Sequence, residues 1–328
     1  MTSIARTILA ALLCAAAAAH AQPAWRPEKS VEIIIGTSPG GPQDRMGRTL
    51  QKVLQESRLV EVPVSVENKP GGGGAVALAA LAQRTGGSTL MINAPTMLNN
   101  QITGKSPLPY TDFTALAILG IEYECVAVRA DSPLKSAKEL VDRLKKDPSA
   151  LSVSIGTSLG NAGHLAYALA MKAAGVDIKK LKTVAFNSAG DGITALLGGH
   201  IDLHIGSVGP LAKQLEAGKV RLLAVTSDQR LPGPLATIPT WKEQGIAGTF
   251  NTWRGLWGPK GMTAEQVAFW DDALERISKD PQWKENLAAN QWESDYRNSR
   301  DTLKYLDVLH VELRDVLKDL GGLAKKLD

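Results

Sequence analysis

The sequence predicts an α/β protein built from two lobes. Strand-like apolar runs alternate with helix-like segments along most of the chain, which favours parallel strands with helices on both faces of a sheet. The chain has 328 residues, more than one hydrophobic core usually organises. The alternation also forms two series, and the second spans roughly 120 residues, a normal domain size.

The first series begins with a strand at 31–36 (VEIIIG) and a helix at 43–56. In the helix, Met46, Leu50 and Val53 recur on one face, as the helical period requires. The elements expected next are a strand at 62–68, a glycine-rich turn at 69–74, a helix at 75–84 and a strand at 88–94.

The second series repeats this pattern before the chain changes character. Its expected elements are strands at 150–156, 181–186, 200–206 and 220–227, helices at 164–174, 193–199 and 210–218, and polar loops at 156–163 and 187–192. From Thr263 onward the sequence is mostly helical and charged, without a new strand–helix–strand unit. We expect this tail to pack on the first lobe.

The first 21 residues predict a secretory signal peptide. Arg6 precedes the apolar run ILAALLCAAAAA, and the small residues of AHA end at Ala21. We expect cleavage after Ala21; the alternative is a short buried helix. Removal of the signal would take Cys14 with it and leave Cys125, which cannot form an intramolecular disulfide alone.

Composition excludes several classes of protein. The chain carries 37 Lys and Arg against 33 Asp and Glu, with no clustered basic stripe, so we expect no nucleic-acid partner. No second apolar segment is long enough to span a membrane, and we therefore expect a soluble exported product. The five histidines are scattered, so we expect neither a metal site nor a cofactor.

The segment SPGGPQD, residues 38–44, connects the first strand to the first helix. Pro42 suits the first helical position, and Asp44 can reach back to the start of the helix and pair with Arg48. These residues explain a helix start without any ligand. Gly40 and Gly41 carry no side chains, however, so an anion can approach the backbone N–H groups there.

Two loops of the second series have the same character. GTSLGNAGH (156–164) and NSAGDG (187–192) each follow a strand and precede a helix, at the sheet edge where ligands usually bind. The glycine run at 70–74 lacks the Lys-Ser/Thr ending of a nucleotide-binding loop, because Ala75 and Val76 follow it. We interpret that run as a tight start of a helix.

An alternative reading makes the chain a secreted hydrolase. GTSLG matches the G-x-S-x-G nucleophile motif, with Ser158 as the nucleophile. The histidines and acids available to complete a triad are His200, His204, His310, Asp191, Asp202 and Asp307. The motif is short and common, so this alternative has the weaker support.

Seven segments, taken in order, carry a family resemblance. They are SPGGPQD (38–44), VENKPGGGG (66–74), GTSLGNAGHLA (156–166), LLGGHID (196–202), AGKVRLLAVTSDQR (217–230), IPTWKEQGI (238–246) and WRGLWGPKGM (253–262). Together they resemble the periplasmic solute-binding proteins of tripartite tricarboxylate transporters, also called the Bug family, over nearly the whole chain after the signal.

The resemblance implies a two-lobed periplasmic binding protein fold of a type II-like kind, with two crossovers and a ligand cleft between the lobes. It places lobe 1 at residues 22–125 and 250–328, and lobe 2 at 126–249. The ligand is expected to be a small organic carboxylate. It would be delivered to a membrane permease, or presented to a membrane sensor, by a non-catalytic, monomeric periplasmic receptor.

The resemblance also implies which residues bind the ligand. The resemblance makes Ser158 a hydrogen-bond donor. It also puts Asp44 in the first ligand loop, but because its own charge would repel an anion, we expect Asp44 to orient the loop rather than to touch the ligand. At Asn187 and at Gly206–Ser207 the chain departs from the family pattern, which commonly has a lysine and an Asp-Asn pair there. The candidate ligand-binding residues are Ser38, Gly40, Gly41, Gln43, Asp44, Thr157, Ser158, Asn161, Asn187 and Ser207.

Overall fold

The computed structural model describes residues 25–40, 42–155, 160–186 and 188–321. The strands are β1 (Val31–Ile35), β2 (Val64–Asn68), β3 (Thr89–Asn93), β4 (Thr114–Arg129), β5 (Ser152–Ser154), β6 (Lys182–Val184), β7 (Leu203–Ser207), β8 (Val220–Val225) and β9 (Asn251–Gly258). The helices are α2 (Pro42–Glu56), α3 (Ala75–Ala82), α4 (Thr96–Ile102), α5 (Ala137–Lys146), α6 (Ala162–Ala173), α7 (Ala189–Leu197), α8 (Val208–Glu216), α9 (Ala264–Lys279), α10 (Pro281–Ala289) and α11 (Ser299–Asp319).

The strands form one mixed sheet in the order β2-β1-β3-β9-β4-β7-β5-β6, and β8 also pairs with β4. Parallel pairing joins β1 to β2 and β3, and it joins β5 to β6 and β7. These are the two parallel series that the sequence predicts. Strand β9 runs antiparallel to both β3 and β4.

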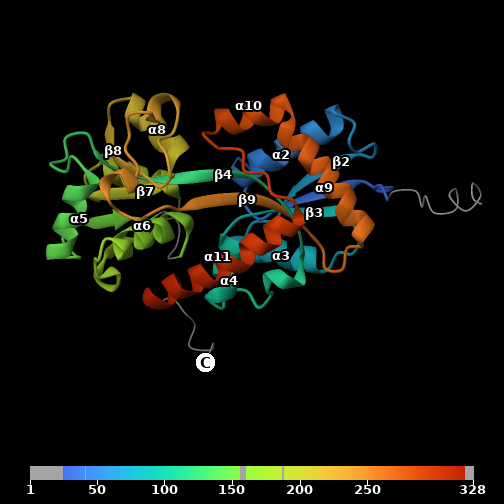
Figure 1. Ribbon diagram of the computed structural model, residues 1–328, viewed down its shortest axis with the longest axis horizontal. Coiled ribbons are helices and arrows are strands. Elements are labelled where there is room, and N and C mark those ends of the chain that lie inside the picture. Colours follow the sequence, from blue (N-terminus) through green and yellow to red (C-terminus); the bar gives the residue numbers. More distant parts are fainter. Residues whose placement is uncertain (1–24, 41, 156–159, 187, 322–328) are drawn as a thin grey trace, which may run out of the picture.

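Strands β4 and β9 connect the two ends of the molecule (Figure 1). In the 16-residue β4, residues 114–123 pair with β9, whereas residues 124–129 pair with β7 and β8. We call β1–β3, α2–α4, α9 and α10 lobe 1, and β5–β8 with α5–α8 lobe 2. The sequence-based division at 125/126 and 249/250 stays a prediction; the pairing partner of β4 changes between Tyr123 and Glu124.

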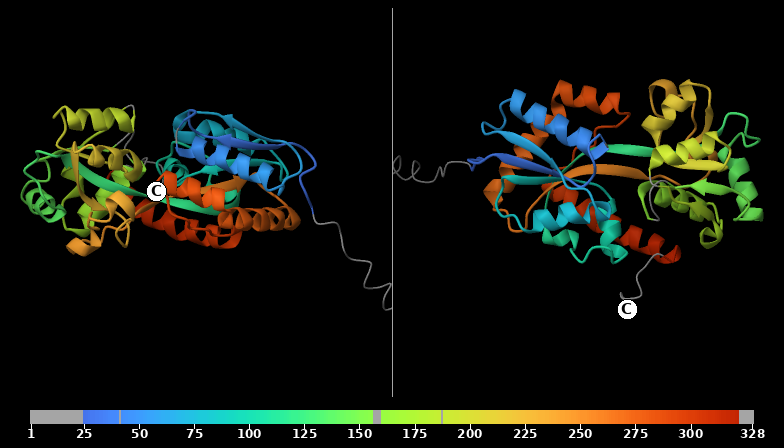
Figure 2. Two further views of the ribbon diagram at one scale, coloured as in Figure 1. Left: turned by 90° about the horizontal axis from the view of Figure 1, so that it is seen from above. Right: turned by 180° about the vertical axis from the view of Figure 1, so that it is seen from behind.

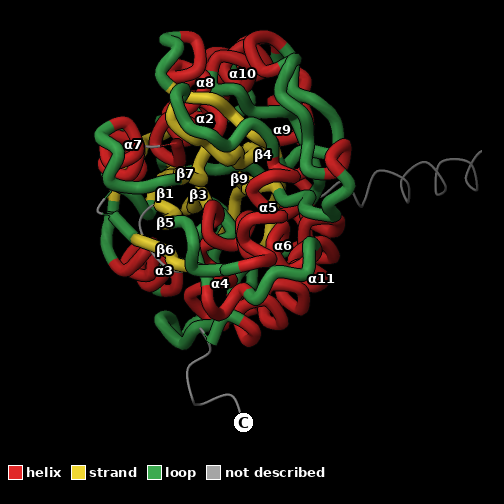
Figure 3. Tube along the Cα trace, turned by 90° about the vertical axis from the view of Figure 1, so that its left-hand side faces the viewer, coloured by secondary structure: helices red, strands yellow, loops and turns green. Residues whose placement is uncertain are grey.

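Helices surround the sheet in both lobes. Seen along the long axis, the strands occupy the middle and the helices the periphery (Figure 3). One apolar cluster packs β1, α2, α9 and α10 together, a second packs β4 and β8 against α7 and α8, and a third extends through both lobes. Within the described residues, no helix combines the length and apolar character that crossing a bilayer requires.

One expectation about local structure is wrong, and another is incomplete. Residues 189–192 are helical instead of a loop, because α7 begins at Ala189 and the Ser188 hydroxyl caps it by accepting the Asp191 N–H. The C-terminal tail does not pack on lobe 1 alone. Helix α11 extends to lobe 2 (Figure 2). There Asp319 pairs with Lys172 of α6 at 2.5 Å.

Candidate functional site

The loop between β1 and α2 is organised around the carboxylate of Asp44. Its Oδ2 accepts a hydrogen bond from the Gly40 N–H at 2.8 Å, and its Oδ1 accepts one from Asn68 Nδ2 at 2.9 Å. Arg48 Nε lies 3.0 Å from Oδ2, so the predicted ion pair is present. Asn68 also donates to the carbonyl of Thr37 at 3.0 Å. The Asp44 carboxylate therefore fixes the conformation of the loop, which is the orienting role expected from the sequence.

The charge of Asp44 is stabilised by these donors. Burial by itself would raise the pKa of Asp44, whose side chain is only 4% exposed. The hydrogen bonds from Arg48, from the Gly40 N–H and from Asn68 outweigh burial and hold the pKa below its usual value. The carboxylate is therefore ionised at neutral pH and repels a ligand anion.

The expectation that the Gly40 N–H is available to a ligand is wrong, because that group donates to Asp44. Gly40 has φ of +84°, a left-handed conformation that favours glycine, so its role is conformational. Gly41 lies outside the described residues. Ser38 is exposed on the same loop, and Gln43 is half-buried in the first turn of α2.

Replacing Asp44 by alanine is expected to lower the free energy of unfolding by about 2–3 kcal/mol, because the Gly40 N–H, Asn68 and Arg48 lose a shared charged partner. Urea denaturation measures this loss. The control is Asp142→Ala, which breaks an exposed pair with Lys138 and should cost less than about 1 kcal/mol. Equal stability of the two variants would contradict the organising role of Asp44.

A small cavity of about 180 Å³ lies in lobe 1 beside the first turn of α2. Gln43 lines it together with Thr37, Asn93 and Thr96, which sequence reasoning missed. The Thr37 hydroxyl is buried without a hydrogen-bond partner among the described residues. The signal that could have found Asn93 and Thr96 is their position along the chain. Asn93 ends β3 and Thr96 begins α4, at the same sheet edge as the loop after β1.

The glycine run forms another wall of this cavity. Gly72–Gly74 make one tight turn, and α3 starts directly after it at Ala75, so the predicted helix start is confirmed. Gly73 and Gly74 line the cavity, and Asn100 fastens the turn by donating to the carbonyl of Gly73 at 3.0 Å. The glycine run therefore lines the cavity in addition to starting helix α3.

In lobe 2 the loop before α6 is partly described. Asn161 is the N-cap of α6, and its side-chain oxygen accepts the His164 N–H at 2.9 Å. The side-chain oxygen of this candidate ligand-binding residue is therefore already used for capping. The Gly160 N–H donates to His164 Nδ1 at 2.9 Å, and Asn99 of α4 donates to the Gly160 carbonyl at 2.5 Å. Thr157, Ser158 and Asn187 lie outside the described residues.

A larger cavity of about 830 Å³ is lined by residues of both lobes. Pro42 and Arg45 contribute from α2, and Ala189, Gly190 and Ser207 contribute from the starts of α7 and α8. Ser207 is the N-cap of α8, yet its side chain makes no capping hydrogen bond. Of the predicted ligand-binding residues, the structure therefore places Ser207 in this cavity.

The lobes approach each other at the edge of this cavity. Arg45 donates to the Gly40 carbonyl and to Asn290 Oδ1, both at 2.8 Å. The carbonyl of Asn290 lies so close to Gly209 of α8 that a Cβ there would be 3.3 Å from it. Helices α8 and α10 lie on the same side of the sheet and belong to different lobes (Figure 1). Through Arg45 and Asn290, the loop between β1 and α2 is thus linked to the start of α8.

Buried charges lie where the two lobes join. Glu122 of β4 lines the large cavity and pairs with Arg254 of β9, with Oε2 and Nη2 2.7 Å apart. Glu124, on the same strand, accepts a hydrogen bond from Thr252 Oγ1 at 3.1 Å. Burial, and next the Glu122 charge, raise the pKa of Glu124 well above that of an exposed glutamate.

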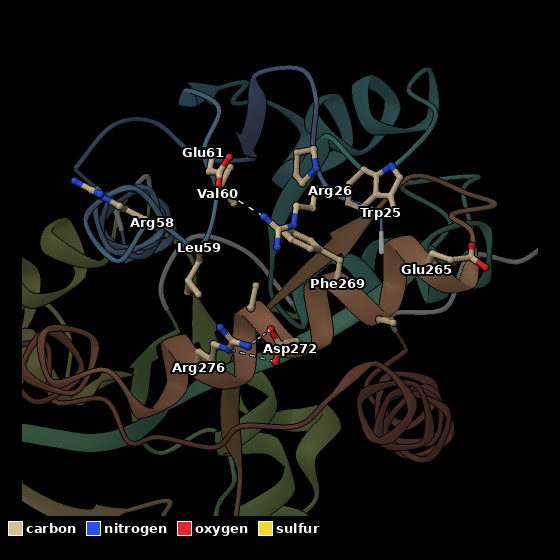
Figure 4. A pocket seen from close by; sticks show the side chains of 13 residues that line it. Trp25, Arg26, Arg58, Leu59, Val60, Glu61, Glu265, Phe269, Asp272 and Arg276 are labelled. Carbon is tan, nitrogen blue, oxygen red and sulfur yellow. Dashed lines mark hydrogen bonds and ion pairs between the residues drawn. The ribbon is translucent and has the colours of Figure 1, made fainter. Parts of the chain in front are cut away.

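A third cavity, of about 490 Å³, lies on lobe 1 between the first described residues and α9 (Figure 4). Its charged side chains include two ion pairs, Arg26–Glu61 at 3.6 Å and Arg276–Asp272 at 2.9 Å. Trp25 and Phe269 pack edge to face in its wall. None of the predicted ligand-binding residues lines it, so we do not take it as the functional site.

The described residues form no hydrolase triad. His204 Nδ1 lies 3.0 Å from Ser154 Oγ, Asp202 accepts from Ser152, and the ring of His310 packs against Tyr110. Among the residues that the structure describes, no hydrogen bond joins His200, His204 or His310 to a carboxylate. No group of three or more metal-binding side chains occurs in that part of the chain.

Comparison with known families gives a match over most of the chain. The family model described as "Tripartite tricarboxylate transporter family receptor" matches residues 47–321. A UPF0065 protein of Cupriavidus necator is 31% identical over 319 residues, which cover 96% of this chain and 94% of that protein.

Solved structures show the same fold. The periplasmic binding protein BugD superposes with a TM-score of 0.73 at 26% identity, covering 90% of this chain and 99% of BugD. The R. palustris protein Rpa4515, solved with adipate, gives a TM-score of 0.76 at 24% identity, covering 90% of this chain and 98% of that one. The two-lobed periplasmic binding fold expected from the sequence is therefore confirmed.

Proposed function

Because this chain belongs to the receptor family of the tripartite tricarboxylate transporters, we propose that it binds a small organic carboxylate between its two lobes. The observation that carries the proposal is the cavity of about 830 Å³, whose wall includes the starts of α2, α7 and α8. Helix N-termini expose N–H groups and carry partial positive charge, so they favour carboxylates. The adipate bound by Rpa4515 is a ligand of this class.

The proposed ligand contacts come from both lobes. Lobe 1 contributes the residues of its first loop, and lobe 2 those that start its helices. Gly40 and Asp44 shape the first loop instead of touching the ligand, because they bond to each other. The proposed contact residues are Ser38, Gly41, Gln43, Thr157, Ser158, Asn161, Asn187 and Ser207.

The proposed mode of action is closure of the lobes around the ligand. In the division that the sequence predicts, residues 22–125 and 250–328 would move relative to residues 126–249, about β4 and β9. The loaded monomer then delivers its ligand to a membrane permease of the tripartite type, or presents it to a membrane sensor. We place this step in the periplasm, after cleavage of the signal peptide at Ala21.

Ligand binding is expected to raise the thermal stability of the purified protein. A ligand that binds only the folded state stabilises it by about 2.7 kcal/mol at a hundredfold excess over its dissociation constant. Thermal-shift screening of mono-, di- and tricarboxylates, followed by calorimetry, measures this effect.

Uncharged alcohols and amides of matching length are the control and should leave the melting temperature unchanged. If no organic acid binds, the receptor proposal fails. The hydrolase alternative makes a different prediction: turnover of an ester substrate that Ser158→Ala abolishes. Such turnover would replace the receptor proposal.

A further inference from the structure

Asn99 of α4 makes a hydrogen bond from lobe 1 to lobe 2. Its side chain is buried, and Nδ2 donates at 2.5 Å to the carbonyl of Gly160, which lies between β5 and α6. Strands β4 and β9 and helix α11 make other bonds between the two ends of the molecule. Apart from these, it is the one hydrogen bond between the lobes in the part of the chain that the structure describes.

Lobe 2 and α11 fix the position of the Gly160 peptide. The Gly160 N–H donates to His164 Nδ1 at 2.9 Å, and burial lowers the pKa of His164 to about 4, so the ring is neutral at pH 7 and accepts this bond. Gly160 has φ of +81°, and a Cβ there would lie 3.4 Å from Leu317 Cδ2 of α11. The carbonyl that accepts from Asn99 is therefore held in one place.

Lobe 1 fixes the donor in the same way. The next residue, Asn100, donates to the carbonyl of Gly73 at 3.0 Å and so attaches α4 to the glycine turn of lobe 1. The two neighbouring asparagines thus bond to different lobes. Asn99 Oδ1 is buried without a partner among the described residues, which is costly for the fold of lobe 1. This cost indicates that the amide serves the contact with lobe 2 and not the stability of α4.

The bond between Asn99 and Gly160 depends on how close the lobes are. When the lobes separate, the amide and the carbonyl bond to water instead, so the bond stabilises only the closed arrangement. Helix α11 packs against both α4 and α6 (Figure 1), and apolar side chains of all three helices belong to one cluster. The bond is therefore made in an environment of low polarity, where hydrogen bonds are stronger than in water.

We propose that Asn99 is a positioning residue that stabilises the closed arrangement of the lobes and thereby sets the ligand affinity without touching the ligand. The inference rests on the proposed function, in which the lobes close around the ligand. The apparent affinity falls in proportion to the fraction of molecules in the binding-competent arrangement. A side chain at position 99 that cannot donate therefore weakens the binding of every ligand by the same factor.

Calorimetry with each acid that the wild type binds tests the effect on affinity. Asn99→Ala should weaken binding roughly two- to tenfold, the effect of one hydrogen bond. Asn99→Asp keeps the size of the side chain but places an oxygen against the Gly160 carbonyl, so its loss should be at least as large. A factor that differs between ligands would mean that Asn99 touches the ligand, and no loss would mean that its bond does not influence closure. Either result would overturn the inference.

Distances between spin labels, measured by double electron–electron resonance without any ligand, provide a readout that does not depend on affinity. Lys105, which follows α4, and Lys179, which follows α6, are exposed, whereas Cys125 is buried. Labels are therefore attached to the variant Lys105→Cys with Lys179→Cys. Adding Asn99→Asp should shift the distance distribution between the lobes toward longer values.

Asn100→Asp is the matched control for the distances, because it removes a buried hydrogen bond of the same type inside lobe 1. It should lower the free energy of unfolding and leave the distances unchanged. Equal distances in the wild type and Asn99→Asp would overturn the inference and leave the receptor function. Binding of no acid at all would remove the receptor function and the role of Asn99 in affinity with it.

Discussion

Replacing Arg254 by methionine is expected to destabilise the protein by about 3–5 kcal/mol at pH 8. Arg254 Nη2 lies 2.7 Å from Glu122 Oε2, and the two side chains are 9% and 4% exposed. The variant leaves Glu122 buried and charged without its partner, beside the second buried carboxyl group of Glu124. An uncompensated charge inside the protein costs far more than the pair itself contributes.

Urea denaturation at pH 8 measures this effect. The double variant Glu122→Met with Arg254→Met should recover most of the stability, because it removes both charges and leaves apolar side chains. Arg230→Met is the matched control: it breaks an exposed pair with Glu243, 3.0 Å apart, and should cost less than about 1 kcal/mol. A similarly small cost for Arg254→Met would show that water reaches Glu122.

Acid is expected to destabilise the protein through two buried histidines. Burial lowers the pKa of both His164 and His204 to about 4, whereas the unfolded chain takes up protons at these residues near pH 6.5. As the pH falls below 6.5, the unfolded state binds more protons, so stability is lost until the folded state also titrates near pH 4. Each ring contributes a loss of about 2–3 kcal/mol by pH 4.5.

Glu124 acts in the opposite direction in the same range. Its pKa is raised in the folded state, so as the pH falls the folded protein takes up this proton first and gains stability. The test therefore compares the loss of stability with pH in the wild type and in a variant, instead of relying on the pH curve of the wild type alone. Between pH 7.5 and 4.5 the variant His164→Gln with His204→Gln should lose about 5 kcal/mol less than the wild type.

His200→Gln serves as the control for this comparison, because His200 is exposed on a turn of lobe 2. Its free energy of unfolding should follow the wild-type curve at every pH. Parallel curves for the wild type and the double histidine variant would contradict the argument, since they would mean that the buried rings titrate alike in the folded and unfolded states.

Local signals explain which elements could be predicted. Helix α2 starts at Pro42 as expected, because the residues that favour this start, Pro42, Asp44 and Arg48, all lie within its first two turns. The long strand β4 could not be predicted, because it is buried on both faces and carries Glu122 and Glu124, which are typical of surfaces. Their burial depends on Arg254 and Thr252, more than 120 residues away along the chain.

Alone, the sequence determined the α/β class, the family and the order of the two parallel series, since propensity, turn chemistry and ordered motifs are encoded locally. It also indicated that Asp44 shapes its loop. Only the tertiary structure decided that the Gly40 N–H is already bonded, and that Ser207 and His204 both line a cavity between the lobes. These facts depend on long-range packing: whether a donor is free for a ligand is settled by which distant groups the fold brings within hydrogen-bond distance.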